Sequence, residues 1–223
     1  MIELKPYQSD FVNDDKFITI GDFSRQLGKT FSLAYIIMKF KPEKCLYMNG
    51  RTPKNISCEI LYGEIKKIGG FMCVNMNDDS TIEIKHINGS MTKVYVKSLK
   101  SEYIFNDYNM LLFDDMLPLE SIFNHNVRKV FSTITCDIHS IRETYRTLYS
   151  CSIKEYGISY CKKEYVKKLY ETLDKDTFRR QIDITGQYKE DKTGYELLNT
   201  VTCIEKDLKC MLNKLISIEE KIN

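Results

Sequence analysis

The tripeptide Gly28-Lys29-Thr30 is the part of this chain with the clearest chemical meaning. It follows the β-like apolar segment 18–20 and precedes residues 31–40, which have the composition of a buried helix. A loop between a strand and a helix N-terminus directs its backbone N–H groups at an anion. In such a phosphate-binding loop (P-loop), Lys29 reaches the terminal phosphates of a nucleotide and the Thr30 hydroxyl ligates Mg²⁺. The tripeptide therefore predicts a site for a nucleotide with Mg²⁺.

Two adjacent carboxylates, Asp114 and Asp115, form a second motif. They follow the apolar run 109–113, as expected of a buried parallel strand with acids at its C-terminal tip. In a P-loop ATPase the first acid holds Mg²⁺ through water and the second polarises the attacking water. The second motif matters because the usual P-loop pattern contains another glycine, which would fall at Phe23. The alternative interpretation is a strand followed by a solvated acidic turn.

A third motif consists of hydroxyl side chains at the end of another predicted strand, 129–134. Ser132, Thr133 and Thr135 could sense the γ-phosphate of a nucleotide, or they could cap a helix that begins near Asp137. The three motifs follow one another in the chain order of a P-loop ATPase. This order favours an ATPase over the purely structural alternatives.

The elements that must position these motifs alternate between strands and helices. We predict strands at 17–20, 44–48, 71–76, 80–86, 91–97, 109–113 and 129–134, and helices at 30–40 and 53–68. Asn88-Gly89 predicts a tight hairpin turn. Thr52 is expected as the N-cap of the second helix, with Pro53 at its first helical position.

This alternation predicts an α/β fold with a largely parallel sheet covered on both faces. Ligands of such folds bind beyond the carboxyl ends of the strands, where Gly28, Asp114 and Thr133 would gather. From the last of these strands onward we expect a mostly helical chain, with turns near Gly157 and Gly186.

Taken in order, these segments resemble the ATPase domain of the large terminase subunit of tailed bacteriophages, the DNA-packaging motor. The resemblance extends from Leu4 to Tyr188. The matching segments are 4–8 (the adenine-recognising segment, with Gln8 as its glutamine), 24–30 (a variant Walker A, which often lacks the first glycine), 80–84 with 88–90 (the hairpin before Walker B), 132–135 (the coupling motif) and 178–182 (the segment that closes the ATPase lobe).

The resemblance implies an α/β fold of the RecA-like (ASCE) P-loop NTPase type, with a mainly parallel central sheet flanked by helices and a helical C-terminal segment. It implies ATP and Mg²⁺ as cofactors. The implied nucleotide-binding residues are Gln8, Ser24, Arg25, Gln26, Leu27, Gly28, Lys29 and Thr30. The implied metal ligands are Thr30 and Asp114, the implied catalytic residues are Asp115 and Arg25, and the implied coupling residues are Ser132, Thr133 and Thr135. Arg25 would stabilise transition-state charge; a static phosphate contact or a salt bridge are its alternatives.

Two departures from the family pattern bear on function. The second Walker B acid is normally Glu, and Asp115 is one methylene shorter, so we expect hydrolysis to be slow or absent if the water is misplaced. The family also continues into an RNase H-like nuclease, whereas 35 residues follow Tyr188. We therefore expect no DNA cleavage by this chain, with the nuclease supplied by another protein.

Bulk composition gives no global nucleic-acid signature. The net charge is +2, with 43% hydrophobic and 29% charged residues. Local basic patches are Lys162, Lys163, Lys167, Lys168 and Arg179-Arg180, for which a solvated helix face is the alternative. Eight cysteines without a Cys-x-x-Cys pair suit a reducing compartment, and Cys45 and Cys73 are expected in the core. With no signal peptide or membrane-spanning run, we expect a soluble protein of the host-cell cytoplasm and no membrane partner.

The C-terminal residues predict a long amphipathic helix. Its apolar positions have heptad spacing and are Leu197, Val201, Ile204, Leu208, Met211, Leu215, Ile218 and Ile222. This stripe could pack on the ATPase lobe, or it could form a coiled coil or dock a partner. We expect an ATPase core at 1–150, a helical closing or linker segment at 151–188 and this helix at 189–223.

The leading functional hypothesis is a terminase-type ATPase without a nuclease, which translocates double-stranded DNA. We expect it to act as a homo-oligomeric ring or with a separate nuclease or portal-type protein. The alternative is a nucleotide-binding assembly or regulatory subunit with weak or no hydrolysis, acting through its C-terminal helix. A helicase-like ATPase is a third possibility, although no helicase-type motif set is found in the sequence.

Overall fold

The computed structural model of the chain describes residues 2–97, 107–118, 127–135 and 151–157, and the single positions 160, 173, 177 and 178. The helices are α1 (Pro6–Val12), α2 (Lys29–Phe40) and α3 (Lys54–Ile68), and the strands are β1 (Ile18–Phe23), β2 (Lys44–Asn49), β3 (Phe71–Met76), β4 (Thr81–His86), β5 (Met91–Lys97), β6 (Met110–Asp114), β7 (Lys129–Ile134) and β8 (Ser152–Tyr156). All of them belong to the first of two compact units, residues 1–185.

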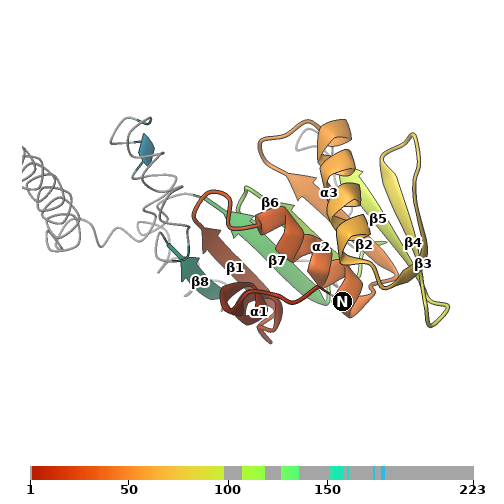
Figure 1. Cartoon of the computed structure of the whole chain (residues 1–223), viewed down its shortest axis with the longest axis horizontal. Coiled ribbons are helices and arrows are strands. Elements are labelled where there is room, and N and C mark those ends of the chain that lie inside the picture. Colours follow the sequence, from red (N-terminus) through yellow and green to blue (C-terminus); the bar gives the residue numbers. More distant parts are fainter. Residues whose placement is uncertain are drawn as a thin grey trace, which may run out of the picture. The chain divides into compact units, whose positions relative to one another are not determined.

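The strands form one sheet of mixed direction in the order β3-β4-β5-β2-β6-β7-β1-β8. From β5 to β8 neighbouring strands are parallel, whereas β3, β4 and β5 pair antiparallel. Figure 1 shows α1, α2 and α3 on one face of this sheet. The carboxyl ends of β1, β2, β6 and β7 therefore meet at one edge, which confirms the predicted α/β fold with a mainly parallel sheet.

The central strands are buried because apolar side chains pack in a core cluster on each face of the sheet. β1 and β6 are buried along their whole length. On the face that carries the helices, Leu112 and Phe131 join a core with Leu33 and Ile37 of α2. On the opposite face, Leu111 packs in a second cluster. Near-continuous burial is typical of parallel strands in α/β proteins.

β1 is longer than predicted, and its end explains the missing glycine of the P-loop pattern. The expected strand was 17–20, but pairing continues through Asp22, opposite Ile134, to Phe23, opposite Tyr156. Phe23 is fully buried. The position of the missing glycine is thus the last residue of a core strand, and the loop begins after it.

The predicted N-terminus of the second helix is corrected by one position. α3 begins at Lys54 with Pro53 as its N-cap, in an extended conformation. Thr52, the expected N-cap, lies one residue earlier in a turn where its backbone N–H donates to the Asn49 side chain (2.7 Å). The Asn88-Gly89 hairpin between β4 and β5 is confirmed, with Gly89 at φ 84°.

Two predictions about individual segments are wrong. Residues 152–156 were expected to be helical but form β8. This short strand contains the charged residues Lys154 and Glu155, and its pairing with β1 determines its position. Cys73 was expected in the core but is exposed, because β3 is an edge strand; Cys45 is buried as expected. The short helix α1 had not been predicted.

Several predicted features lie outside the described residues. They are the helix near Asp137, the basic residues at 162–168 and 179–180, and the C-terminal helix at 189–223. Within the described part of the chain, no helix is long and apolar enough to cross a membrane.

Asp14, in the connection between α1 and β1, holds β8 in place. Its carboxylate accepts hydrogen bonds from the Thr19 hydroxyl (3.0 Å), the Ser152 hydroxyl (2.9 Å) and the Lys16 backbone N–H (2.9 Å), and lies 3.1 Å from the Lys154 ammonium. Burial acts to raise the pKa of Asp14, but these contacts outweigh it and hold the pKa below its ordinary value. The ionised carboxylate therefore stabilises the fold.

We expect Asp14→Asn to lower the free energy of unfolding at pH 7 by about 1–3 kcal/mol, because an amide cannot accept all of these hydrogen bonds. The pKa of Asp14 is lower in the folded state than in the unfolded state. The stabilisation by its carboxylate is therefore complete above the unfolded-state pKa, and it is lost as the pH falls through the folded-state pKa. Urea titrations at pH 7 and pH 3 should thus show a smaller difference from wild type at pH 3. The exposed neighbour, varied as Asp15→Asn, is the control; equal effects of both variants would contradict the prediction.

Gly21 of β1 packs under two aromatic rings that support the strand. A Cβ at this position would lie 2.3 Å from Cε2 of Phe23 and 2.9 Å from Cε2 of Phe11, both fully buried. We expect Gly21→Ala to destabilise the protein by about 1–3 kcal/mol in urea unfolding. Gly63→Ala is the control. It lies inside α3 with no atom within 4 Å of its added Cβ, so it should be neutral or stabilising by about 0.5–1 kcal/mol.

Candidate functional site

The loop between β1 and α2, which is the predicted P-loop, has a tightly turned backbone. Gln26 and Gly28 have positive φ angles of 64° and 78°, and the Leu27 N–H donates to the Ser24 carbonyl (3.3 Å). Gly28 is the N-cap of α2, which begins at Lys29. The N-terminus of α2, where a helix leaves its first N–H groups without helical partners and favours an anion, thus follows directly on this loop.

The loop is fixed at both ends by neighbouring elements. The Ser24 N–H donates to the Tyr156 carbonyl of β8 (2.9 Å). From α1, the Tyr7 hydroxyl (3.0 Å) and the Gln8 side-chain amide (3.4 Å) both donate to the Leu27 carbonyl. Gln8 is 6% exposed, and its carbonyl oxygen accepts from the Lys5 N–H (3.1 Å). The expected adenine-binding glutamine is thus seated against the P-loop backbone.

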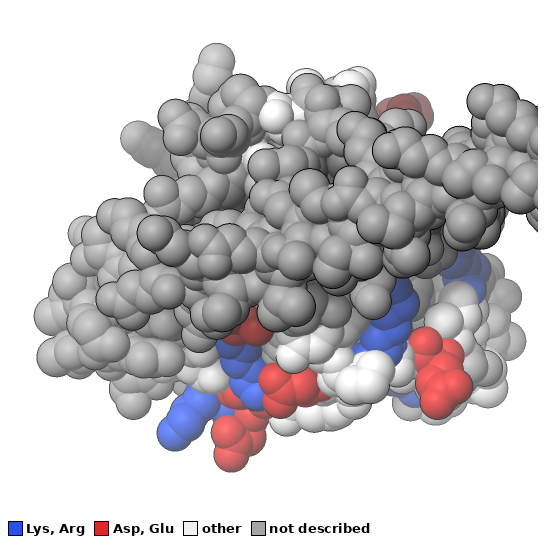
Figure 2. All heavy atoms as spheres, turned by 60° about the vertical axis from the view of Figure 1, so that its left-hand side comes forward, with Lys and Arg blue, Asp and Glu red and all other residues white. Residues whose placement is uncertain are grey.

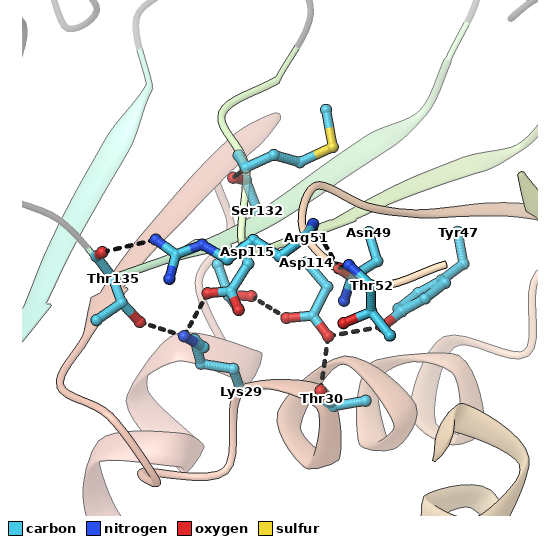
Figure 3. Close-up of polar contacts among 12 residues, drawn as sticks. Lys29, Thr30, Tyr47, Asn49, Arg51, Thr52, Asp114, Asp115, Ser132 and Thr135 are labelled. Carbon is cyan, nitrogen blue, oxygen red and sulfur yellow. Dashed lines mark hydrogen bonds and ion pairs between the residues drawn. The ribbon is translucent and has the colours of Figure 1, made fainter. Parts of the chain in front are cut away.

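Asp114 is the central acceptor of the site. Its side chain is 1% exposed, and one oxygen, Oδ2, accepts hydrogen bonds from the hydroxyls of Thr30 and Tyr47, both at 2.6 Å. Oδ1 accepts from the Thr133 hydroxyl at 2.8 Å. Figure 3 shows how Thr30 and Tyr47 approach this carboxylate from α2 and β2. Three donors from three elements offset the cost of burying the charge.

Tyr47 was not singled out from the sequence. It is fully buried in β2, and burial, followed by the charge of Asp114, raises the pKa of its phenol well above the ordinary value. The phenol therefore stays protonated and remains a donor to Asp114. Its position near the carboxyl end of a predicted strand could have indicated a site residue. That inference also requires the pairing of β2 with β6, which brings Tyr47 to Asp114.

The side chain of Lys29 contacts the carboxylate of Asp115. Its ammonium forms an ion pair with Asp115 and also donates to the Thr135 hydroxyl (Figure 3). Asp115 has a positive φ of 56°, so the chain turns sharply after β6 and directs its carboxylate toward the P-loop lysine. Lys29 and Asp115 keep 14% and 21% of their side-chain surface exposed, which leaves the pair accessible to a ligand.

The expected coupling residues have different partners. Thr133 contacts Asp114 and Thr135 contacts Lys29, whereas the Ser132 hydroxyl donates to the Met116 carbonyl (2.6 Å) and so secures the loop after β6. Arg25 and Gln26 are exposed on the P-loop. The structure thus gathers Lys29, Thr30, Asp114, Asp115, Thr133 and Thr135 and leaves Arg25 at the rim.

The arrangement of Thr30 and Asp114 suits Mg²⁺ better than it suits a metal ion that is coordinated by protein side chains alone. Among the described residues no cluster of three or more His, Cys, Asp or Glu side chains could hold a metal ion. The Thr30 hydroxyl and the Asp114 carboxylate provide two oxygens 2.6 Å apart. Mg²⁺ commonly binds through one or two carboxylates together with phosphates and water, so this pair is suited to a metal that arrives with a nucleotide.

Comparison with known proteins finds the same fold in bacteriophage large terminases. The ATPase domain of the large terminase of Thermus phage P74-26 aligns with a TM-score of 0.59 at 10% identity, covering 82% of this chain and 93% of that domain. The large terminase of bacteriophage HK97 aligns with a TM-score of 0.52 at 12% identity, covering 87% of this chain and 49% of that protein. No family model and no curated protein matches the sequence.

These alignments establish the fold. The chain has the RecA-like α/β architecture of large terminase ATPase domains, as its sequence motifs had suggested. It spans about half of the HK97 terminase.

The Tyr47 hydroxyl should make a measurable contribution to stability. We expect Tyr47→Phe to lower the free energy of unfolding by about 1–3 kcal/mol, because Asp114 would be buried with one donor fewer. The control is Tyr62→Phe, whose hydroxyl makes a long 3.5 Å contact with the Val74 carbonyl and should matter by less than about 0.5 kcal/mol. Urea unfolding of both variants tests this. A Tyr47→Phe variant as stable as wild type would show that its hydroxyl does not support Asp114.

Proposed function

We propose that this chain is an ATPase of the viral DNA-packaging terminase type, which couples ATP hydrolysis to translocation of double-stranded DNA in the host-cell cytoplasm. The observation that carries the proposal is the meeting of Thr30 with Asp114 and of Lys29 with Asp115 at one edge of the sheet. A hydroxyl–carboxylate pair beside a lysine is what Mg²⁺ and the terminal phosphates of ATP require.

The proposed roles follow from these contacts. Thr30 and Asp114 would hold Mg²⁺, which supplies charge stabilisation on the phosphates when bound. Lys29 would exchange its contact with Asp115 for one with a phosphate, and this exchange frees the Asp115 carboxylate to orient the attacking water. The backbone N–H groups of residues 24–30 would surround the phosphates, and Arg25 at the rim would stabilise transition-state charge.

Coupling to movement is proposed to begin in β7. Thr133 and Thr135 contact Asp114 and Lys29, the two residues whose partners change when a nucleotide with Mg²⁺ binds. A shift of either contact displaces the end of β7, and Ser132 carries the displacement to the loop at Met116. Gln8 would report on the adenine through its contact with the Leu27 carbonyl.

DNA and further subunits are the partners that this function implies. Figure 2 shows Lys and Arg side chains interspersed with Asp and Glu over the described part of one face. This mixture of charges among the described residues fits the net charge of +2. We therefore propose that a homo-oligomeric ring, or a portal-type or nuclease partner, contributes to the grip on DNA.

A second candidate function is a nucleotide-binding assembly subunit with weak or no hydrolysis. The observation that favours it is Asp115, which stands where a longer glutamate is usual and is already paired with Lys29. A short carboxylate held by the lysine is poorly placed to reach a water at the γ-phosphate. The two functions differ in turnover, and both require nucleotide binding.

ATP turnover should depend on Lys29. We expect Lys29→Ala to lower turnover by at least about 100-fold, because the residue contacts charge that develops in the transition state. The measurement is steady-state phosphate release with and without double-stranded DNA. Lys44→Ala, an exposed lysine at the amino end of β2, is the control and should leave turnover unchanged.

The Asp115→Glu variant separates the two functions. DNA-stimulated turnover by wild type supports the motor. Tight ATP binding without turnover, with turnover gained in Asp115→Glu, would contradict the motor and leave the assembly subunit.

A further inference from the structure

Arg51 lies in a turn that is built against the candidate site. After β2 ends, the Asn49 side-chain oxygen accepts hydrogen bonds from the backbone N–H groups of Arg51 (2.8 Å) and Thr52 (2.7 Å). This is an Asx turn, in which a side chain replaces the backbone acceptor and fixes the following residues. The Gly50 N–H donates to the Asp114 carbonyl at 2.9 Å. The turn is thus tied to the end of β6.

Gly50 brings the turn into backbone contact with Asp115. A Cβ at Gly50 would lie 2.7 Å from the Asp115 carbonyl oxygen and 2.9 Å from the Met116 Cβ, so a larger residue would push the two loops apart. The absence of a side chain therefore sets a short, fixed separation between the loop after β2 and the loop after β6. Arg51, the next residue, therefore lies beside the end of β7, where its side chain contacts Thr135.

Two cations converge on Thr135 as a result. The Arg51 guanidinium donates from Nη2 to the Thr135 carbonyl (3.3 Å), while the Lys29 ammonium donates to the hydroxyl of the same residue. Figure 3 shows the guanidinium beside Thr135, on the side to which Lys29 also points. The nearby Asp115 carboxylate is already paired with Lys29. Since both cations contact the same residue, an anion that reaches both of them is favoured by charge.

We propose that Arg51 binds the terminal phosphate of ATP and so makes the site distinguish ATP from ADP; this inference rests on the proposed nucleotide-binding function. The guanidinium has five N–H donors in a planar fork suited to phosphate oxygens. Its 3.3 Å contact with a neutral carbonyl is easily exchanged for a charge-assisted one. When the γ-phosphate is lost, Arg51 returns to the Thr135 carbonyl, and the end of β7 reports the change.

A structural role for Arg51 makes a different prediction. If its function were to cap the Thr135 carbonyl, its replacement would affect ATP and ADP alike through the position of β7. Arg51 is exposed, and its backbone is fixed by Asn49 rather than by its own side chain. Replacement of the side chain should therefore leave the turn and the fold intact, which allows its effect on ligands to be measured directly.

The test is isothermal titration calorimetry of the full chain with Mg²⁺ and either ADP or the non-hydrolysable ATP analogue AMP-PNP. We expect Arg51→Ala to weaken AMP-PNP binding about 10- to 100-fold and to leave ADP binding within about twofold. Arg51→Lys, which keeps the charge but loses the fork, should fall between wild type and Arg51→Ala. Arg128→Ala, an exposed arginine at the amino-terminal edge of the sheet, is the matched control.

The possible outcomes separate this inference from the proposed function. Equal weakening of both ligands, or no weakening of either, overturns the role of Arg51 while nucleotide binding itself stands. Wild-type protein that binds neither ligand overturns the proposed function and this inference together. Loss of AMP-PNP affinity alone in Arg51→Ala, with an unchanged thermal unfolding midpoint, supports the inference.

Discussion

A carboxylate that is almost fully removed from solvent organises this structure. Asp114 can be buried because α2, β2 and β7 each present a hydroxyl to it, through Thr30, Tyr47 and Thr133. Each donor comes from a different segment of the chain, so the carboxylate has all of its hydrogen-bond partners when α2, β2 and β7 have assembled. The free energy of burying one charge thereby links the formation of the site to the completion of the sheet.

Parallel strand pairing brings these donors together. Asn49, Asp114 and Thr133 stand opposite one another at the ends of β2, β6 and β7, although they are far apart in the sequence. The turn after β2 then approaches so closely that Gly50 has no space for a side chain against Asp115. Side chains from three loops can face one ligand because these loops leave the sheet at the same edge.

Much of this arrangement could be predicted from residues with strong local patterns. The apolar run before Asp114, the Gly28-Lys29-Thr30 loop and the Asn88-Gly89 turn fix their own structure, and the structure agrees with each. Prediction failed where long-range pairing decides the outcome. Residues 152–156 are a strand because β1 offers them an edge, and Cys73 is exposed because β3 ends the sheet, which nothing in the local sequence reveals.

The same reasoning explains which site residues the sequence concealed. Lys29, Thr30, Asp114 and Asp115 belong to motifs whose spacing has chemical meaning. Tyr47 and Arg51 belong to no motif. The contact of Tyr47 with Asp114 and the role proposed for Arg51 both depend on strand order, which cannot be read from a single sequence. Residues of this kind become visible when the neighbour of each strand is known.

The ion pair between Lys29 and Asp115 gives Lys29 an internal counterion. An anion that contacts Lys29 alone gains one ionic contact at the expense of another, so a simple phosphate or sulfate has little net advantage over the resident carboxylate. A ligand that also engages the loop N–H groups and the Asp114 region gains contacts that Asp115 does not supply. In the proposed nucleotide site, the pair would therefore compete with incoming anions for Lys29 and favour larger ligands that carry several charges.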